Sequence, residues 1–322
     1  MSTSSVPVSA AQIAGQVCLP HLCSLQNGDG GWGFAVGGGS RVEPTAWALL
    51  ALSEFPASSA IQNAVVRGTE FIKRVQLADG SWPTSDGQMT GAWVTSIAIW
   101  ALLAMSQAGS REVTERALSW LVADRPRSAG FWRRLVRTIA ARKSVAEQDD
   151  SYYGWSWTPQ TASWVEPTAQ AVVVLQKSAH LAPAKATRRL ELAELMLFDR
   201  MCPGGGWNCG NPMVYGVPGE PLIGPTVWAL LALRDKFERP EIQQSLAWLE
   251  KNWNKGLTLG SLALSHIAFA TFQYNTISIT DALCRACEGD NAAWTVPAIA
   301  WVLLAISEKR AWLLPVEREK GR

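Results

Sequence analysis

The stretch Arg41-Val-Glu-Pro-Thr-Ala-Trp-Ala-Leu-Leu-Ala51 decides the fold of this 322-residue chain, because related stretches follow it further along. It returns as Trp164-Val-Glu-Pro-Thr-Ala-Gln170 and as Gly224-Pro-Thr-Val-Trp-Ala-Leu-Leu-Ala232. Shorter copies of its apolar half are Trp100-Ala-Leu-Leu-Ala104 and Trp301-Val-Leu-Leu-Ala305. Repetition of one unit along a chain is the sequence signature of a repeat architecture.

Each copy predicts a buried α-helix. The segment from Pro44 to Leu52 is apolar on nearly all sides, as a helix surrounded by other helices requires. Proline fits the first helical turn, where its missing N–H leaves no hydrogen bond unmade. The acidic residue before it, Glu43 or Glu166, is favoured at a helix N-terminus. We therefore expect inner helices to begin near residues 43, 94, 166, 224, 260 and 295.

Segments of a second kind separate these apolar helices. Their apolar residues recur at spacings of three and four, which is typical of an amphipathic helix that covers another helix. Two such sets are Ile61, Val65, Gly68, Ile72 and Val75, and Ile242, Leu246, Leu249 and Trp253. Glycine-rich turns at 28–33, 79–82 and 203–210 separate the helix pairs. About six alternations of inner and outer helix are predicted, and such an array can close into a barrel.

The composition predicts a soluble protein with a large core. Hydrophobic residues make up 48% of the chain and charged residues 17%, and there are 17 tryptophans. The repeats favour a single domain over residues 1–322. No apolar run reaches the roughly 18 residues of a membrane-spanning helix, and residues 1–11 lack a cationic region ahead of an apolar one. We expect a cytoplasmic protein.

The cysteines are expected to be reduced thiols on or near helices. The six cysteines include one Cys-x-x-Cys pair, Cys284 and Cys287, which could serve redox chemistry or bind a metal. A zinc site needs further cysteine or histidine ligands, and the chain has no second pair and three histidines. We therefore expect neither a metal site nor a cofactor.

The turns before the apolar helices carry a second repeated element. Gln26-Asn-Gly-Asp-Gly-Gly-Trp32 and Gln76-Leu-Ala-Asp-Gly-Ser-Trp82 share the pattern Gln-x-x-Asp-Gly-x-Trp. They resemble the glutamine-tryptophan repeat of squalene-hopene and oxidosqualene cyclases, and the Thr-Ala-Trp-Ala-Leu-Leu-Ala helices resemble inner helices of that family. The resemblance covers most of residues 20–307. It implies an all-α fold, an α/α toroid of about six inner and six outer helices, and a protein that handles isoprenoids.

The resemblance also points to an acid. In those cyclases an Asp-x-Asp-Asp sequence at the start of an inner helix protonates an alkene or epoxide. Trp164-Val-Glu-Pro-Thr-Ala169 is similar in register, so Glu166 falls where the proton-donating aspartate would lie, and Glu43 is its equivalent in another repeat. Trp164 and Pro167 replace the flanking aspartates, which normally help to hold and polarise such an acid. The alternative is that both glutamates only cap their helices.

A second acidic candidate is Glu147-Gln-Asp-Asp150, in which Asp149 and Asp150 are candidate catalytic residues. The aromatic residues that follow could stabilise a carbocation through their π electrons. The alternative is that the two aspartates are solvated loop residues. Candidate substrate-binding residues are Trp93, Tyr153, Trp155, Trp157 and Trp164. Most tryptophans on the inner helices are instead expected to be core residues.

A basic amphipathic insertion is predicted at about residues 125–160. Residues 125–146 contain seven basic residues and no acidic one, and Arg133, Arg134 and Arg137 lie around an apolar helical face. Such a helix commonly lies on an anionic membrane surface, and it could instead bind a diphosphate group or a partner protein. The alternative is an outer helix with a solvated basic face. The net charge of +2 and the lack of a recognised motif disfavour nucleic-acid binding.

Several functions remain open from the sequence. The first is a terpene cyclase that starts by protonation, an isomerase or lyase with an isoprenoid or other apolar substrate. The triterpene cyclases place their cavity between two toroid domains, so a partner chain or a homo-oligomer would complete the site. The second is a prenyltransferase β-like subunit, although Asp281 and Cys284 have the wrong spacing for its zinc site. The third is a non-catalytic toroid that serves as a scaffold or binds isoprenoids, and a carbohydrate-active enzyme is a further possibility.

Overall fold

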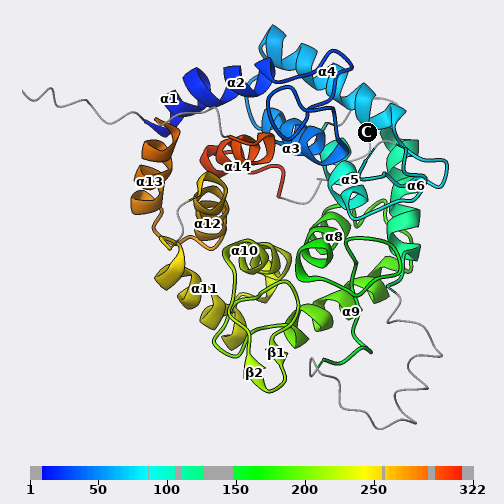
Figure 1. Cartoon of the computed structure of the whole chain (residues 1–322), viewed down its shortest axis with the longest axis vertical. Helices are drawn as coiled ribbons and strands as arrows, with labels where there is room; N and C mark the ends of the chain where they lie inside the picture. Colours follow the sequence, from blue (N-terminus) through cyan, green and yellow to red (C-terminus); the bar gives the residue numbers. More distant parts are fainter. Residues whose placement is uncertain are drawn as a thin grey trace, which may run out of the picture.

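A computed structural model describes residues 9–85, 87–105, 110–126, 148–255, 258–288 and 294–313. The helices form two concentric rings (Figure 1). Each helix of the inner ring packs against the next one, and the last packs against the first, so the ring is closed. The inner helices are α3 (Val42–Ser53), α5 (Val94–Met105), α8 (Val165–Lys177), α10 (Ile223–Ala232), α12 (Leu259–Thr271) and α14 (Val296–Ile306). The predicted α/α toroid is confirmed.

The outer ring covers the inner one, helix by helix. Five outer helices each follow the inner helix on which they pack: α4 (Ser59–Arg74), α6 (Ser110–Ala123), α9 (Ala186–Asp199), α11 (Pro240–Asn252) and α13 (Ile277–Cys287). The sixth outer position is filled from the beginning of the chain, by α1 (Ala10–Gln12), the π-helix η1 (Ile13–Cys18) and α2 (Leu19–Ser24). Because η1 and α2 pack against α14, the two ends of the helical array meet and close the toroid.

Three short elements complete the described structure. The strands β1 (Met213–Val214) and β2 (Val217–Pro218) pair antiparallel in the connection that leads to α10. The 3-10 helix η3 (Arg234–Lys236) follows α10. None of the described helices is long and apolar enough to cross a lipid bilayer.

The inner helices begin within one residue of the predicted positions, and their burial explains why. In α3 every residue from Pro44 to Leu52 is buried. Such a helix contacts neighbours on all sides, so its sequence carries no polar stripe. The outer helix α4 instead buries one face, which includes Ala64, Gly68 and Ile72, and leaves the opposite face in solvent.

A tryptophan precedes each of four inner helices and joins that helix to the preceding outer one. The indole Nε1 of Trp32 donates to the carbonyl of Leu22 at 2.8 Å, while its backbone N–H donates to the Thr45 hydroxyl at 2.8 Å. The same pair of bonds recurs at three further tryptophans, whose backbone partners are threonines of α5, α8 and α10: Trp82 with Thr95, Trp155 with Thr168 and Trp207 with Thr226. Each bond pair satisfies buried donors that would otherwise cost free energy.

The glutamines of the repeated turns connect neighbouring outer helices. The Gln26 amide nitrogen donates to the carbonyls of Gly30, in its own turn, and of Ala64, in α4. The Gln76 amide nitrogen donates in the same way to Gly80 and to Val113 of α6. The Gln-x-x-Asp-Gly-x-Trp pattern therefore serves two contacts, one inward through tryptophan and one sideways through glutamine.

Tryptophans pack the middle of the barrel. The rings of Trp47 in α3 and Trp228 in α10 stack with centroids 5.3 Å apart, although these helices lie on opposite sides of the inner ring. Trp301 meets Trp47 edge-on at 5.8 Å. Trp100 completes this group, and all of them but Trp301 are at most 2% exposed. The space at this level is thus occupied by aromatic side chains.

The segment 307–313 closes the barrel at the C-terminal ends of the inner helices. The Trp312 ring packs on Trp100 at 5.2 Å, and the Trp100 indole N–H donates to the Trp312 carbonyl at 2.6 Å. Glu54, which follows α3 and is 3% exposed, accepts the backbone N–H of Trp312 at 2.8 Å and that of Ala311 at 3.2 Å. The Ser307 hydroxyl donates to the same carboxylate at 2.8 Å. Three donors thus hold a buried carboxylate in place.

Candidate functional site

Glu43 and Glu166 occupy the same position in two inner helices. Each is the second residue of its helix, α3 or α8, and lies two residues before the threonine that binds a tryptophan N–H. This register places both side chains at the N-terminal end of the barrel, and both are partly buried. No hydrogen bond to either carboxyl group occurs among the described residues. Neither glutamate therefore caps its helix through its side chain.

The two carboxyl groups share an environment that favours the protonated form. Burial raises the pKa of Glu43 to about 7, and the negative charge of Glu166 raises it as well. Burial raises the pKa of Glu166 to about 7. Desolvation and a like charge nearby both disfavour a carboxylate. Near neutral pH this pair can hold a proton and release it, which is what a general acid requires.

Gly224 and Cys209 border Glu166. Gly224 stands in α10 where α3 and α8 carry their glutamates, and a Cβ atom on it would lie 3.1 Å from Glu166 Oε1. The missing side chain therefore leaves space for the carboxyl group. The Cys209 carbonyl accepts the N–H of Val165 at 3.1 Å. Burial, followed by the charge of Glu166, raises the pKa of the Cys209 thiol.

Two buried polar atoms lie one helical turn below the glutamates. Trp47 and Gln170 each follow a glutamate by four residues, so they share its helix face. Trp47 is fully buried and Gln170 is 4% exposed. Among the described residues, neither the Trp47 indole N–H nor Gln170 Oε1 has a hydrogen-bond partner. One donor and one acceptor are thus available beneath the acids to a water molecule or to a polar group of a ligand.

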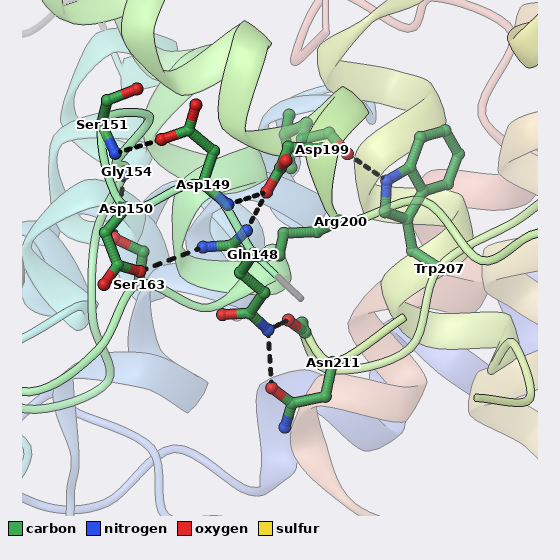
Figure 2. Close-up of polar contacts among 12 residues, drawn as sticks. Gln148, Asp149, Asp150, Ser151, Gly154, Ser163, Asp199, Arg200, Trp207 and Asn211 are labelled. Atoms are coloured by element: carbon green, nitrogen blue, oxygen red, sulfur yellow. Dashed lines mark hydrogen bonds and ion pairs between the residues drawn. The ribbon is translucent and has the colours of Figure 1, made fainter. Parts of the chain in front are cut away.

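The structure places Asp149 and Asp150 beside the end of α9 (Figure 2). The Asp149 carboxylate accepts a hydrogen bond from the N–H of Ser151 at 2.8 Å, and the backbone N–H of Asp149 donates to the Asp199 carboxylate at 3.2 Å. Asp150 lies 3.9 Å from the guanidinium group of Arg200, which also binds Asp199. These contacts connect both aspartates to the outer ring, whereas Glu43 and Glu166 lie on inner helices.

The aromatic candidates have different surroundings. Trp155 is 2% exposed and belongs to the set of tryptophans that join outer to inner helices. Tyr153 lies under the Arg189 guanidinium group at 4.8 Å. Trp93 and Trp157 meet edge-on at 4.6 Å, and Trp164 is the residue immediately before α8. A cavity beside Trp93 and Trp155 has a volume of about 10 Å³, enough for roughly one water molecule.

Other predicted features lie elsewhere or outside the described residues. Arg133, Arg134 and Arg137 fall in the undescribed segment 127–147, so the basic insertion stays a prediction. Cys284 and Cys287 lie on α13 as free thiols. Within the described ranges, no group of three or more histidine, cysteine, aspartate or glutamate side chains could hold a metal ion.

The sequence singled out the two glutamates as candidates, but not the residues around them. The repeat register identified Glu43 and Glu166, and the same register contains Gly224, which could have been recognised as the position where a third repeat omits the side chain. Gln170 occupies the position of Trp47 and Trp228 in its own repeat. Cys209 carried no sequence signal, because it comes near Glu166 only through the path of the chain before α10.

Comparisons with known proteins identify the fold. No protein-family model and no curated protein sequence matches this chain. Among solved structures, the type II terpene cyclase MstE from Scytonema aligns with a TM-score of 0.63 and 15% identity, over 95% of this chain and 100% of MstE. A protein from Actinoplanes aligns with a TM-score of 0.63 and 14% identity, over 92% and 98%. Cellobiose 2-epimerase from Spirochaeta thermophila gives 0.59 and 13%, over 92% and 95%. At these identities the similarity shows the fold alone.

Proposed function

We propose that this chain is a toroid enzyme that protonates an isoprenoid-like substrate, in the manner of a protonation-initiated terpene cyclase. Glu166 is the proton donor and Glu43 assists it. The observation that carries the proposal is that two equivalent glutamates lie at one end of the barrel and that burial raises the pKa of each to about 7. An apolar substrate fits the proposal because MstE, a type II terpene cyclase with this fold, binds geranylgeranyl dihydroxybenzoate as its substrate.

The pair supplies part of what alkene protonation needs. Two nearby carboxyl groups do not ionise together readily, so one of them keeps its proton near neutral pH. The proton moves from the carboxyl oxygen of Glu166 to one carbon of the alkene, and the other carbon becomes cationic. The stacked rings of Trp47 and Trp228, one turn below the acids, stabilise such a charge through their π electrons. The reaction ends when a neighbouring carbon loses a proton, or when water is captured and loses one; that proton returns to the carboxylate pair and restores the acid.

The packed middle of the barrel limits how far a substrate can enter. Trp47 and Trp228 occupy the level below the acids, so only the reacting end of a long molecule would reach them. Exposed apolar residues are frequent in the connections that lead to the inner helices, at the same end as the glutamates: Phe34, Val36, Met89, Val214, Tyr215, Val217 and Leu222. These side chains offer an apolar surface for the remainder of the substrate.

The proposal is tested by product analysis. The purified chain is incubated with squalene, with geranylgeranyl dihydroxybenzoate and with prenyl diphosphates of several lengths, and the products are separated by gas chromatography and identified by mass spectrometry. Cyclisation that ends in proton loss leaves the mass unchanged, so retention and fragmentation provide the readout, whereas capture of water adds the mass of one water molecule. Glu166→Gln should abolish product and Glu43→Gln should reduce it, because the amide donates no such proton.

Glu70→Gln is the matched control, since Glu70 is exposed on α4 and pairs with Lys73. This variant should retain full activity. Equal product from the native protein and Glu166→Gln would remove Glu166 from the mechanism.

A non-catalytic, isoprenoid-binding toroid is the second candidate, and the tryptophans that fill the middle of the barrel favour it. This function predicts saturable binding of a long-chain isoprenoid alcohol without any product. Binding that is unchanged in Glu166→Gln, with no turnover of any substrate, would support the second candidate over the first.

A further inference from the structure

A groove of about 480 Å³ lies at the end of the barrel opposite the glutamates. It forms where α10 and α12 end and where the segment 307–313 crosses the barrel. Two arginines, Arg234 and Arg310, contribute to its wall together with three apolar residues, Phe237, Phe272 and Leu313. None of the described residues that line it is acidic. The groove therefore combines cationic groups with an apolar surface.

Both arginines are held by neutral acceptors. Arg234 Nη1 donates to the Leu231 carbonyl at 2.9 Å and to Gln176 Oε1 at 2.8 Å. Arg310 Nη1 donates to the Ala270 carbonyl at 2.6 Å. A guanidinium group has five N–H donors, so each arginine keeps donors for a ligand. Among the described residues, neither makes an ion pair with a carboxylate within 4.0 Å.

The acidic groups in this region have partners of their own. Asp235, the neighbour of Arg234 in the chain, pairs with Lys236 at 2.6 Å. The Glu54 carboxylate accepts the N–H groups of Ala311 and Trp312. Burial lowers the pKa of Lys177, Glu54 raises it and Arg234 lowers it by a smaller amount, while burial and then Arg310 lower the pKa of His266. Among the described residues that line the groove, only the two arginines are charged.

The backbone at the groove adopts an uncommon conformation at two positions. Gln273 has φ of 60° and Arg310 has φ of 47°, in the left-handed region that residues other than glycine rarely occupy. Only four such non-glycine residues occur in the described ranges, and two of them line this groove. Conformations of this kind gather at ligand sites, where the surrounding structure holds them in place.

We propose that this groove binds a single-chain amphiphile with a phosphate head group. The phosphate oxygens lie between the guanidinium groups of Arg234 and Arg310, whose planar arrays of donors match an oxyanion. The hydrocarbon chain lies against Phe237 and Phe272, whose rings stack at 5.8 Å, and against Leu313. This site is separate from the glutamates and does not depend on their proposed reaction.

Calorimetric titration of the full chain tests the proposal with three probes. Octyl phosphate, below its critical micelle concentration, carries both features of the ligand, whereas inorganic phosphate and octanol each carry one. We expect saturable one-to-one binding of octyl phosphate. Inorganic phosphate and octanol should each bind at least about tenfold more weakly. If inorganic phosphate bound as tightly as octyl phosphate, the hydrocarbon chain would play no part in binding. If octanol bound as tightly as octyl phosphate, the arginines would not form an anion site. Either result would refute the proposal.

Two variants locate the site. Arg310→Gln removes one cation and should weaken octyl phosphate binding about tenfold, since an Arg–phosphate contact is charge-assisted. Phe237→Ala removes an apolar wall whose side chain is 38% exposed, so the fold should tolerate it while octyl phosphate binding falls. Arg188→Gln, at an exposed site on α9, is the matched control and should bind normally. Unchanged affinity in both Arg310→Gln and Phe237→Ala, with unchanged thermal unfolding, would refute this location.

Discussion

Glu43 and Glu166 show how position in a repeat can create an acid pair. Each residue lies in the first turn of an apolar helix, where the helix dipole ordinarily favours a glutamate. Neither carboxyl group has a hydrogen-bond partner among the described residues, and the charge of Glu166 acts on Glu43. The same local sequence thus starts a helix in two repeats and, once the ring closes, places one carboxyl group where its charge acts on the other.

The raised pKa of Glu166 makes stability depend on pH. The folded protein keeps a proton on Glu166 up to pH of about 7, whereas the unfolded chain releases it from about 4.5 upward, so this contribution to folding is lost as pH rises through that window. Glu166→Gln carries no charge. It should raise the free energy of unfolding by about 1–3 kcal/mol near pH 8.5 and by less than about 0.5 kcal/mol near pH 4.5.

Thermal and urea unfolding at the two pH values measure this difference. Glu70→Gln, at the exposed site on α4, should show no comparable change between them. If Glu166→Gln changed the free energy of unfolding equally at both pH values, the raised pKa of Glu166 would be contradicted.

Gly224 should control the position of the Glu166 carboxyl group. A Cβ atom in Gly224→Ala would lie 3.1 Å from Glu166 Oε1 and displace it, while alanine favours the helix by about 1 kcal/mol. We expect product formation to fall about tenfold with no loss of stability. Gly28→Ala is the control, because no atom lies within 4 Å of its added Cβ. Full activity in Gly224→Ala would show that the carboxyl group does not need its present position.

At the scale of elements, the threonines of the inner helices hold the tryptophan turns in place. Thr168 is fully buried, and its hydroxyl accepts the Trp155 N–H at 2.9 Å. Thr168→Val keeps the shape and leaves that N–H unpaired, so it should lower the free energy of unfolding by about 1–3 kcal/mol. Thr168→Ser keeps the hydroxyl and should cost less than the valine variant in chemical denaturation. The reverse order would show that packing, and not the hydrogen bond, dominates here.

The sequence predicted helices better than turns. Inner helices could be placed within a residue because their apolar character, with a proline at several helix starts, marks both burial and a boundary. The glycines predicted the turn at 203–210, but neither Trp207 nor Trp155 was matched to the repeated tryptophan element, because both turns lack the glutamine of Gln26 and Gln76. That glutamine only connects neighbouring outer helices, whereas the tryptophan contact is common to all four turns.

At the scale of the molecule, the buried carboxylate of Glu54 holds the segment that closes the barrel. Glu54→Ala would leave the N–H groups of Ala311 and Trp312 and the Ser307 hydroxyl without their acceptor. We expect a loss of about 2–4 kcal/mol in the free energy of unfolding and faster hydrogen exchange at both amides. Glu250→Ala, at an exposed site on α11, should change neither quantity. Unaltered exchange at Trp312 in Glu54→Ala would contradict this role.

The interior of the barrel could be predicted only in part. The repeats predicted a closed ring, and most tryptophans of the inner helices were expected in the core. The stacking of Trp47 on Trp228 depends on the diameter of the ring. The contact of Trp312 with Trp100 depends on the path of the segment 307–313. Neither can be read from a linear pattern, because the partners are far apart in the chain.

Closure of the inner ring also restricts how such a protein can evolve. An open solenoid can gain or lose a repeat at its end, because each unit contacts only its neighbours. Here α14 packs against α3, so every inner helix has two inner neighbours and no repeat is terminal. Removing one helix pair would shrink the ring around side chains that already meet across it. Changes in length are therefore confined to the connections between helices, and the number of repeats is set by the circumference of the ring.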